Sequence, residues 1–210
     1  MGTVILAATE AIKAIPDHYF QAVGSGTGAI AVWEMAWRLV TDATYGQKLP
    51  RLHLSQTQAF PLMAAAWDAQ SRALPDLPVD QARAAARRAY SPVLSNRKPP
   101  YSLAGGLFDA LSETRGIFYV PSDEEAEAAG KQFTELEGID LDKAAQVCFA
   151  SFLQAAEAHA FSSREIILVN LTGGGARRAF EDGIAIPATP DVIFSKDDIS
   201  PETIKAKMGL

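Results

Sequence analysis

The sequence predicts an α/β fold, with a mostly parallel sheet flanked by helices. An apolar, aromatic strand pattern at 18–23 leads into a glycine-rich loop, an Ala-rich helical pattern at 29–39 and a short strand pattern at 52–54. Strand, loop, helix and strand in this order form a crossover unit, which joins parallel strands. The length of 210 residues suits one domain. We therefore expect a single domain over 1–210, with an irregular C-terminal segment from about 187.

The other segments continue the alternation of helices and strands. In chain order we expect helices over 3–14, 60–71 and 81–90, a strand over 116–120, helices from Ser122 and over 141–160, and a strand over 164–171. Ser122 followed by Glu125 is the pattern of a capping box. The strand over 164–171 has the clearest apolar run, so we expect it to be buried.

Composition limits the classes of partner. Hydrophobic residues make up 48% of the chain and charged residues 21%, as in soluble globular proteins. A net charge of -6 argues against general binding to nucleic acid, and no apolar run approaches the length of a membrane span. One cysteine, Cys148, excludes an intrachain disulfide and fits a reducing compartment. A cytoplasmic protein without nucleic-acid or membrane partners is the expectation.

A first glycine loop joins the strand at 18–23 to the helix that follows. It consists of Gly24, Ser25, Gly26, Thr27 and Gly28. Backbone N–H groups at a helix N-terminus can converge on an anion, and the two hydroxyls add donors suited to a phosphate monoester. A Walker A loop is excluded because no Gly-Lys-Ser/Thr follows, and the spacing disfavours a dinucleotide fingerprint. Phosphate binding and a purely structural turn both remain open.

A second glycine loop, Thr172 to Gly175, follows the strand pattern at 164–171. Open α/β sheets bind ligands at the carboxyl ends of their strands, so the two loops could flank one ligand.

Several other residues invite a functional interpretation that the pattern does not support. The histidines His18, His53 and His159 lack metal-ligand spacing, and Cys148 lies on an apolar helix as an inert buried thiol would. The arginines over 83–88 and the basic stretch 95–101 fit a solvated helix and loop, or alternatively an anion-binding or lid surface.

Separate motifs in a common order resemble the C-terminal part of cysteate synthase and of threonine synthase-like, fold-type II enzymes that depend on pyridoxal 5'-phosphate (PLP). These motifs include 18–28, 52–56, 97–101, 105–111, 137–140 and 170–175. The resemblance implies a PLP cofactor whose phosphate is held by Gly24 to Gly28. It also implies that the Thr172 hydroxyl faces the pyridine nitrogen and that Glu137 lies near the ring. For Glu137, a surface carboxylate that flanks a helix is the alternative.

The implied reaction is β-replacement or elimination on an O-phosphorylated amino acid, such as O-phosphoserine with sulfite as the nucleophile. Ser55, Gln56 and Thr57 would contact that substrate. The segment 57–60 departs from the family pattern after Ser55 and Gln56, which implies a changed substrate pocket.

The resemblance implies a further polypeptide, because the aldimine lysine of these enzymes belongs to their N-terminal part. None of the lysines in this sequence has a matching context, so we assign no catalytic residue to this chain. We expect a hetero-oligomer with a lysine-bearing N-terminal subunit or fragment. The alternative is a non-catalytic binding or regulatory module that keeps the phosphate-binding fold.

Overall fold

A computed structural model describes residues 2–184, 188–195 and 199–210. The chain divides into two compact units, residues 1–176 and 177–210. The first unit carries the sheet and both glycine loops. The second contains α9 (Pro201–Met208), so the segment expected to be irregular is helical there. The expected single domain over 1–210 stays a prediction.

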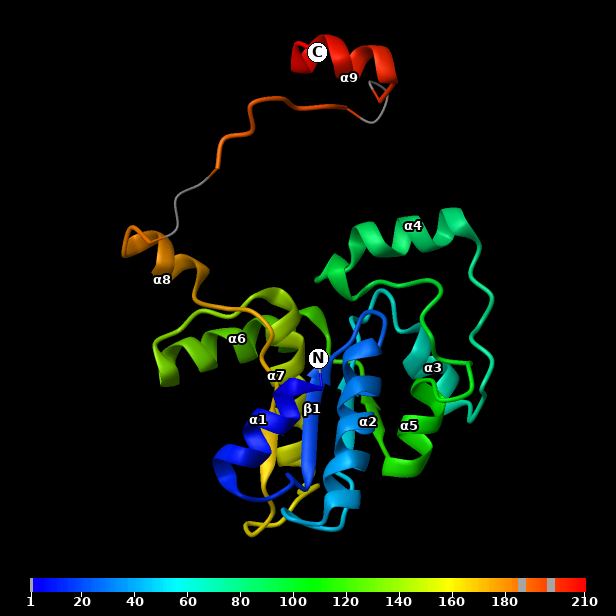
Figure 1. The fold of residues 1–210 in the computed structure, drawn as a ribbon, viewed down its shortest axis with the longest axis vertical. Coiled ribbons are helices and arrows are strands. Elements are labelled where there is room, and N and C mark those ends of the chain that lie inside the picture. Colours follow the sequence, from blue (N-terminus) through cyan, green and yellow to red (C-terminus); the bar gives the residue numbers. More distant parts are fainter. Residues whose placement is uncertain (1, 185–187, 196–198) are drawn as a thin grey trace. The chain divides into compact units, whose positions relative to one another are not determined.

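The first unit is built on a four-stranded parallel sheet in the order β3-β2-β1-β4. Figure 1 shows β1 among the helices of this unit. Its strands are β1 (His18–Ala22), β2 (Arg51–Ser55), β3 (Ile117–Tyr119) and β4 (Ile167–Val169). The helices of the chain are α1 (Thr3–Ile12), α2 (Thr27–Asp42), α3 (Leu62–Asp68), α4 (Val79–Arg88), α5 (Leu107–Thr114), α6 (Asp123–Glu137), α7 (Lys143–Glu157), α8 (Ala176–Glu181) and α9, with a short 3-10 turn, η1 (Pro92–Leu94). The predicted α/β class is confirmed.

Each face of the sheet is covered by helices because alternate strand residues point to opposite sides. On one face, Tyr19, Leu52 and Leu54 join a core with side chains of α1, α2, α3 and α5. On the other, Phe20 packs with Val147 and Cys148 of α7, and α6 lies against α7. The sheet therefore presents its carboxyl edge as a row of strand ends between two helical layers.

The strand, loop, helix and strand predicted from 18 to 54 are present in the structure. The strand predicted over 164–171, however, is less buried than expected. Ser122 caps α6: Glu125 N–H donates to Ser122 Oγ (3.1 Å) and Ser122 N–H donates to Glu125 Oε2 (2.6 Å). The strand expected over 164–171 covers only 167–169, and all three of its residues are half-buried. β4 lies at one edge of the sheet and pairs with β1 alone among the described strands. No described strand therefore packs along its outer side. No described helix is both long and apolar enough to cross a membrane.

Cys148 is predicted to be unreactive in the folded chain. Its side chain is 1% exposed, and burial raises the pKa of the thiol to about 12. Because the thiolate is the nucleophile, iodoacetamide at pH 8 should label this cysteine only after denaturation. The protonated thiol is the form that the fold favours, so this contribution to stability is present below about pH 9 and is lost as the pH approaches 12. Rapid labelling of the native chain would contradict a sealed core around α7.

Candidate functional site at the carboxyl edge of the sheet

The three segments predicted to bind ligand lie at the same edge of the sheet. β1 pairs with β2 through Ala22 and Ser55, and with β4 through Phe20 and Val169. Because these strands are parallel, the loops that follow them emerge side by side. The first glycine loop is therefore flanked by Ser55 to Thr57 on one side and by the second glycine loop on the other.

The first glycine loop ends at the open N-terminus of α2. Gly26 is the N-cap residue and makes no side-chain cap bond, while Thr27 N–H donates to Ser25 Oγ (3.4 Å). The first turn contains no acidic residue. Ser25 Oγ and Thr27 Oγ1 share a hydrogen bond of 2.9 Å, so the two hydroxyls lie together beside the first N–H groups of α2. A helix N-terminus with hydroxyl donors and no carboxylate favours an anion.

The glycines of this loop are also required by packing within the chain. Gly26 has φ +78°, which L side chains adopt rarely, and a Cβ there would lie 2.6 Å from Leu107 Cδ2. A Cβ at Gly24 would lie 2.6 Å from the Val93 carbonyl oxygen, because η1 runs against the loop. The loop can therefore be both a structural turn and an anion site. Packing fixes its glycines, while no carboxylate occupies the first turn of α2.

A polar network ties β4 to β1 directly below the two loops. Asn170 N–H donates to the Phe20 carbonyl (2.9 Å), and Asn170 Nδ2 donates to Tyr19 Oη (2.7 Å). Tyr19 Oη in turn donates to Gln21 Oε1 (3.1 Å), and burial raises the pKa of Tyr19 well above its usual range. Tyr19 therefore stays a neutral donor. No local pattern predicts this link, although Asn170 stands two residues before Thr172.

The second glycine loop is anchored at its far end. Asp142 N–H donates to the Gly173 carbonyl (3.1 Å), and Gly175 N–H donates to the Asp140 carbonyl (2.7 Å). Between these two bonds, Leu141 and Gly174 form an isolated antiparallel β-bridge. Thr172 itself is exposed at the end of β4. Glu137 is exposed at the last turn of α6 and makes no described contact with either glycine loop. Its place near the cofactor ring stays a prediction.

The three residues predicted to contact substrate are buried at the end of β2. Gln56 Oε1 accepts hydrogen bonds from the N–H groups of Met63 (2.9 Å) and Ala64 (3.0 Å), so this side chain satisfies the N-terminus of α3. Within the described ranges, Ser55 Oγ, Gln56 Nε2 and Thr57 Oγ1 are buried without a hydrogen-bond partner. These orphaned polar atoms are unusual in a folded chain. Gln56 has a structural role that sequence reasoning missed.

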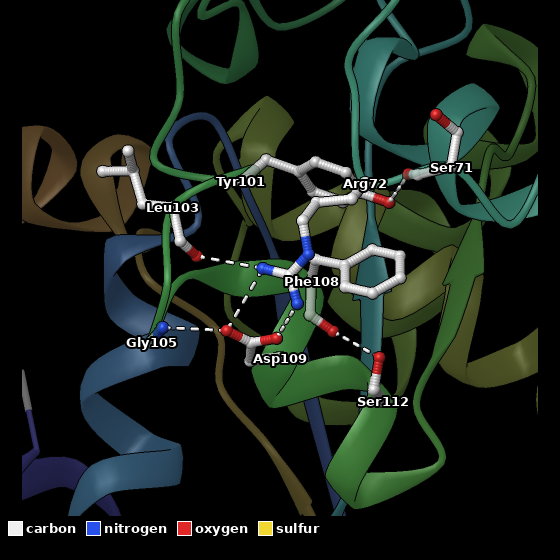
Figure 2. Close-up of polar contacts among 8 residues, drawn as sticks. All are labelled: Ser71, Arg72, Tyr101, Leu103, Gly105, Phe108, Asp109 and Ser112. Carbon is white, nitrogen blue, oxygen red and sulfur yellow. Dashed lines mark hydrogen bonds and ion pairs between the residues drawn. The ribbon is translucent and has the colours of Figure 1, made fainter.

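Arg72 and Asp109, which lies on α5, form a clamp that holds the loop 100–106 (Figure 2). This loop lies beside α2. The Arg72 guanidinium pairs with Asp109 and lies 4.6 Å from the centroid of the Phe108 ring, while Asp109 Oδ2 accepts from Gly105 N–H (2.8 Å). The bonds to Arg72 hold the pKa of the Asp109 carboxyl below its usual range. The clamped loop and Thr27 line a cavity of about 270 Å³. The sequence indicated a basic loop here but not the clamp.

Comparison with protein families identifies the lineage. The family described as "Pyridoxal-phosphate dependent enzyme" matches residues 1–173. Cysteate synthase of Methanoregula boonei is 46% identical over 210 residues, which are 100% of this chain and 49% of that protein. Cysteate synthase of Methanosarcina barkeri is 47% identical over 206 residues, 98% of this chain and 50% of that protein. The chain thus spans about half the length of the curated relatives it matches.

Solved structures show the same fold at low sequence identity. A threonine deaminase from T.th. matches with a TM-score of 0.54 and 16% identity over 84% of this chain and 56% of that one. A fungal L-serine ammonia-lyase from Rhizomucor miehei matches with a TM-score of 0.60 and 15% identity over 87% of this chain and 54% of that one. The family match and the carboxyl-edge geometry agree with the resemblance first seen in the glycine loops. The chain belongs to the family of pyridoxal-phosphate dependent enzymes.

Proposed function

We propose that this chain is the phosphate-binding part of a PLP-dependent enzyme and acts together with a second, lysine-bearing polypeptide. The observation that carries the proposal is the open N-terminus of α2, with Ser25 and Thr27 beside it, next to Thr172 on the neighbouring strand end. Gly24, Ser25, Gly26, Thr27 and Gly28 would hold the cofactor phosphate. Thr172 would face the pyridine nitrogen.

The donor set fits a phosphate monoester. The first turn of α2 offers backbone N–H groups, the loop adds two hydroxyls, and the helix dipole favours a negative charge at this end. The absence of acidic residues in that turn removes the repulsion that would disfavour an anion. Bound PLP supplies an electron sink to the substrate amino acid.

The Thr172 hydroxyl sets the character of that site. A neutral hydroxyl can hydrogen-bond a ring nitrogen without giving it a full proton, whereas a carboxylate would stabilise the protonated ring. A moderately electron-withdrawing ring suits loss or replacement of a β-substituent. We therefore assign to Thr172 the role of holding the ring nitrogen in its neutral form.

The substrate side is proposed to lie at the end of β2. Ser55 and Thr57 have hydroxyl oxygens buried without a partner in the described chain, at the same sheet edge as the phosphate loop. A polar substrate or a second polypeptide would satisfy them. Gln56 would act indirectly, because its Oε1 is committed to α3, leaving only Nε2 for a ligand.

The reaction is proposed to be cysteate synthase-like, with O-phosphoserine and a nucleophile such as sulfite as substrates. The curated relatives carry that activity in their names, and this chain spans about half of their length. The departure at 57–60 leaves the choice of nucleophile to experiment. A module that binds phosphate or a partner without catalysis is the second candidate, favoured by the absence of a lysine in matching context.

Phosphate release distinguishes the two candidates. The chain should be mixed with the unmatched half of the Methanoregula boonei relative, PLP, O-phosphoserine and sulfite, and inorganic phosphate measured by molybdate colour. We expect release only when both polypeptides are present, and loss of release when the cofactor lysine of the added half is replaced by alanine. A stable complex that binds PLP yet releases no phosphate with sulfite, sulfide or cysteine would leave the binding module as the function.

A further inference from the structure

A polar cavity of about 540 Å³ lies at the amino ends of the strands, away from the carboxyl edge that carries the glycine loops. His18 begins β1, Arg51 begins β2, and Arg115 stands two residues before β3; all three line the cavity together with Lys48, Asp17 and Glu165. The volume falls in the range of small-molecule sites. The proposed cofactor function does not use any of these side chains.

Each carboxylate of the cavity accepts a hydrogen bond from a backbone N–H through one of its two oxygens. Asp17 Oδ2 accepts from Ile166 N–H (2.9 Å), and Glu165 Oε2 accepts from Ser162 N–H (2.6 Å). The Ser162 N–H lowers the pKa of the Glu165 carboxyl, with a smaller contribution from His18.

The cations are less committed. Arg51 donates from Nε to the Arg115 carbonyl (2.8 Å), which leaves its terminal nitrogens for other acceptors. In the described part of the chain, neither the Lys48 ammonium nor the Arg115 guanidinium has an ion-pair partner. Lys48, Arg51 and Arg115 thus outnumber the two carboxylates that line the cavity, Asp17 and Glu165, so its lining carries a net positive charge.

His18 offers a buried ring nitrogen on the same cavity. Its side chain is 6% exposed, and Nδ1 lies 2.9 Å from His53 Nε2, while His53 Nδ1 lies 2.9 Å from Tyr119 Oη. Burial, with the nearby His18 and Arg51, lowers the pKa of His53 to about 3, so that ring is neutral and has one donor and one acceptor. His18 Nε2 lies 3.4 Å from Glu165 Oε1 but makes no hydrogen bond to a described residue. It is a buried ring nitrogen with a carboxylate nearby but without a hydrogen-bond partner.

Arg115 occupies a backbone conformation that normally selects glycine. It ends α5 with φ 52° and ψ 41°, in the left-handed region, and its side chain is exposed on the cavity. A non-glycine residue at such a helix end costs stability relative to glycine.

We propose that this cavity binds a small oxyanion, a phosphate or carboxylate group, through Arg115, Lys48 and the Nε2 of His18. The anion would provide an ion-pair partner for Arg115 and Lys48, which have none in the described chain. It would also provide a hydrogen-bond partner for His18 Nε2, whose nearest carboxylate oxygen, Glu165 Oε1, lies 3.4 Å away. Charge-assisted hydrogen bonds from a guanidinium and an ammonium supply the affinity. Because His18 would contact the anion, its imidazole resonance would report binding. Through His53 and Tyr119, the occupied cavity is connected by hydrogen bonds to β3, on the far side of β2.

The test is Arg115→Gly, with Lys13→Gly as its matched control. Lys13 is also an exposed basic residue at a helix end with positive φ, but it does not line the cavity. Both variants lose one positive charge and gain a glycine where glycine is favoured, so both should melt at the wild-type temperature or higher. Inorganic phosphate and, separately, acetate should be titrated into the 210-residue chain while the imidazole resonances are followed by NMR. The chain has three histidines, of which His159 is exposed and serves as an internal reference.

We expect the His18 resonance to shift on titration with at least one of the two anions, and Arg115→Gly to weaken that binding roughly tenfold, since a charge-assisted hydrogen bond contributes about that much. Lys13→Gly should bind as wild type. Thr27→Asp, which blocks the glycine loop, should leave the His18 response unchanged, so failure of the proposed cofactor site and failure of this one are separable. A shift with phosphate alone identifies a phosphate site, and a shift with acetate as well identifies a general oxyanion site. No His18 shift with either anion, or equal affinities in wild type and Arg115→Gly, would overturn the proposal.

Discussion

Replacing Thr27 with aspartate is expected to abolish cofactor retention while leaving the fold intact. Thr27 is the exposed first residue of α2, and an acidic side chain at that position stabilises a helix through its dipole. The same carboxylate would face the bound phosphate. Two unit charges about 4 Å apart repel by roughly 4 kcal/mol at an effective dielectric of about 20, which corresponds to about a thousandfold loss of affinity. PLP retained by the two-polypeptide complex after gel filtration, read by absorbance, measures the effect.

Thr27→Asn is the matched control because it has nearly the same size and shape as aspartate but carries no charge. It should keep most of the affinity, so a difference between the two variants isolates the electrostatic effect. Gly26→Asp is a poorer probe: φ +78° and the approach of Leu107 would strain any side chain there, and loss of binding could reflect misfolding. Equal retention of PLP by wild type and a well-folded Thr27→Asp would show that the phosphate does not bind at α2.

The fold was predictable where the relevant signal is local. The pattern from 18 to 54 predicts β1, the glycine loop, α2 and β2 because hydrophobic periodicity and glycine position act over a few residues. The capping box of α6 is equally local, with Ser122 and Glu125 three residues apart. These features needed no knowledge of which strands become neighbours, and all were confirmed.

Contacts between distant residues were not predictable from the same signals. Asn170 and Tyr19 are 151 residues apart. Trp33 and Trp37 both donate to Oε2 of Glu113, on α5, which lies 80 and 76 residues further along the chain. The sequence shows which residues are polar but not which strands bring them together. For the same reason, the three loops could be placed at strand ends, whereas the commitment of Gln56 to α3 could not.

The half-buried state of β4 fits the proposed second polypeptide. Residues 164–171 have the apolar run of a strand covered on both sides, yet in this chain Ile167 to Val169 are only half-buried and Ile166 is 37% exposed. β4 also ends the sheet of the described chain, so its outer backbone groups have no strand partner there. Soluble proteins seldom leave an apolar edge strand open, because it pairs readily with other chains. The curated relatives are about twice as long as this chain, and their remaining half supplies a candidate cover.

We therefore expect PLP to become covalently attached only in a complex, and to a lysine of the second chain. Borohydride reduction followed by peptide mass spectrometry should find no stoichiometric adduct on the 210-residue chain alone and one on the partner after mixing. Such attachment needs a positioned, partly desolvated amine, and neither glycine loop of this chain contains a lysine. A stoichiometric adduct on one lysine of this chain would refute the requirement for a partner.

The same complex should protect β4 from exchange with solvent. Amide hydrogens of 166–171 should exchange more slowly after mixing if the partner covers this edge, within an obligate interface of well over ~2,000 Å². Ile166→Glu should prevent assembly, because it places a charge on that edge, whereas Ile193→Glu adds the same charge at a residue that is 72% exposed in the C-terminal unit and should not. Unchanged exchange of β4 in an active complex would mean that the partner docks elsewhere. A monodisperse monomer that neither binds the second chain nor gains activity with it would leave the binding module as the function, because a catalytic half-site cannot work without its lysine.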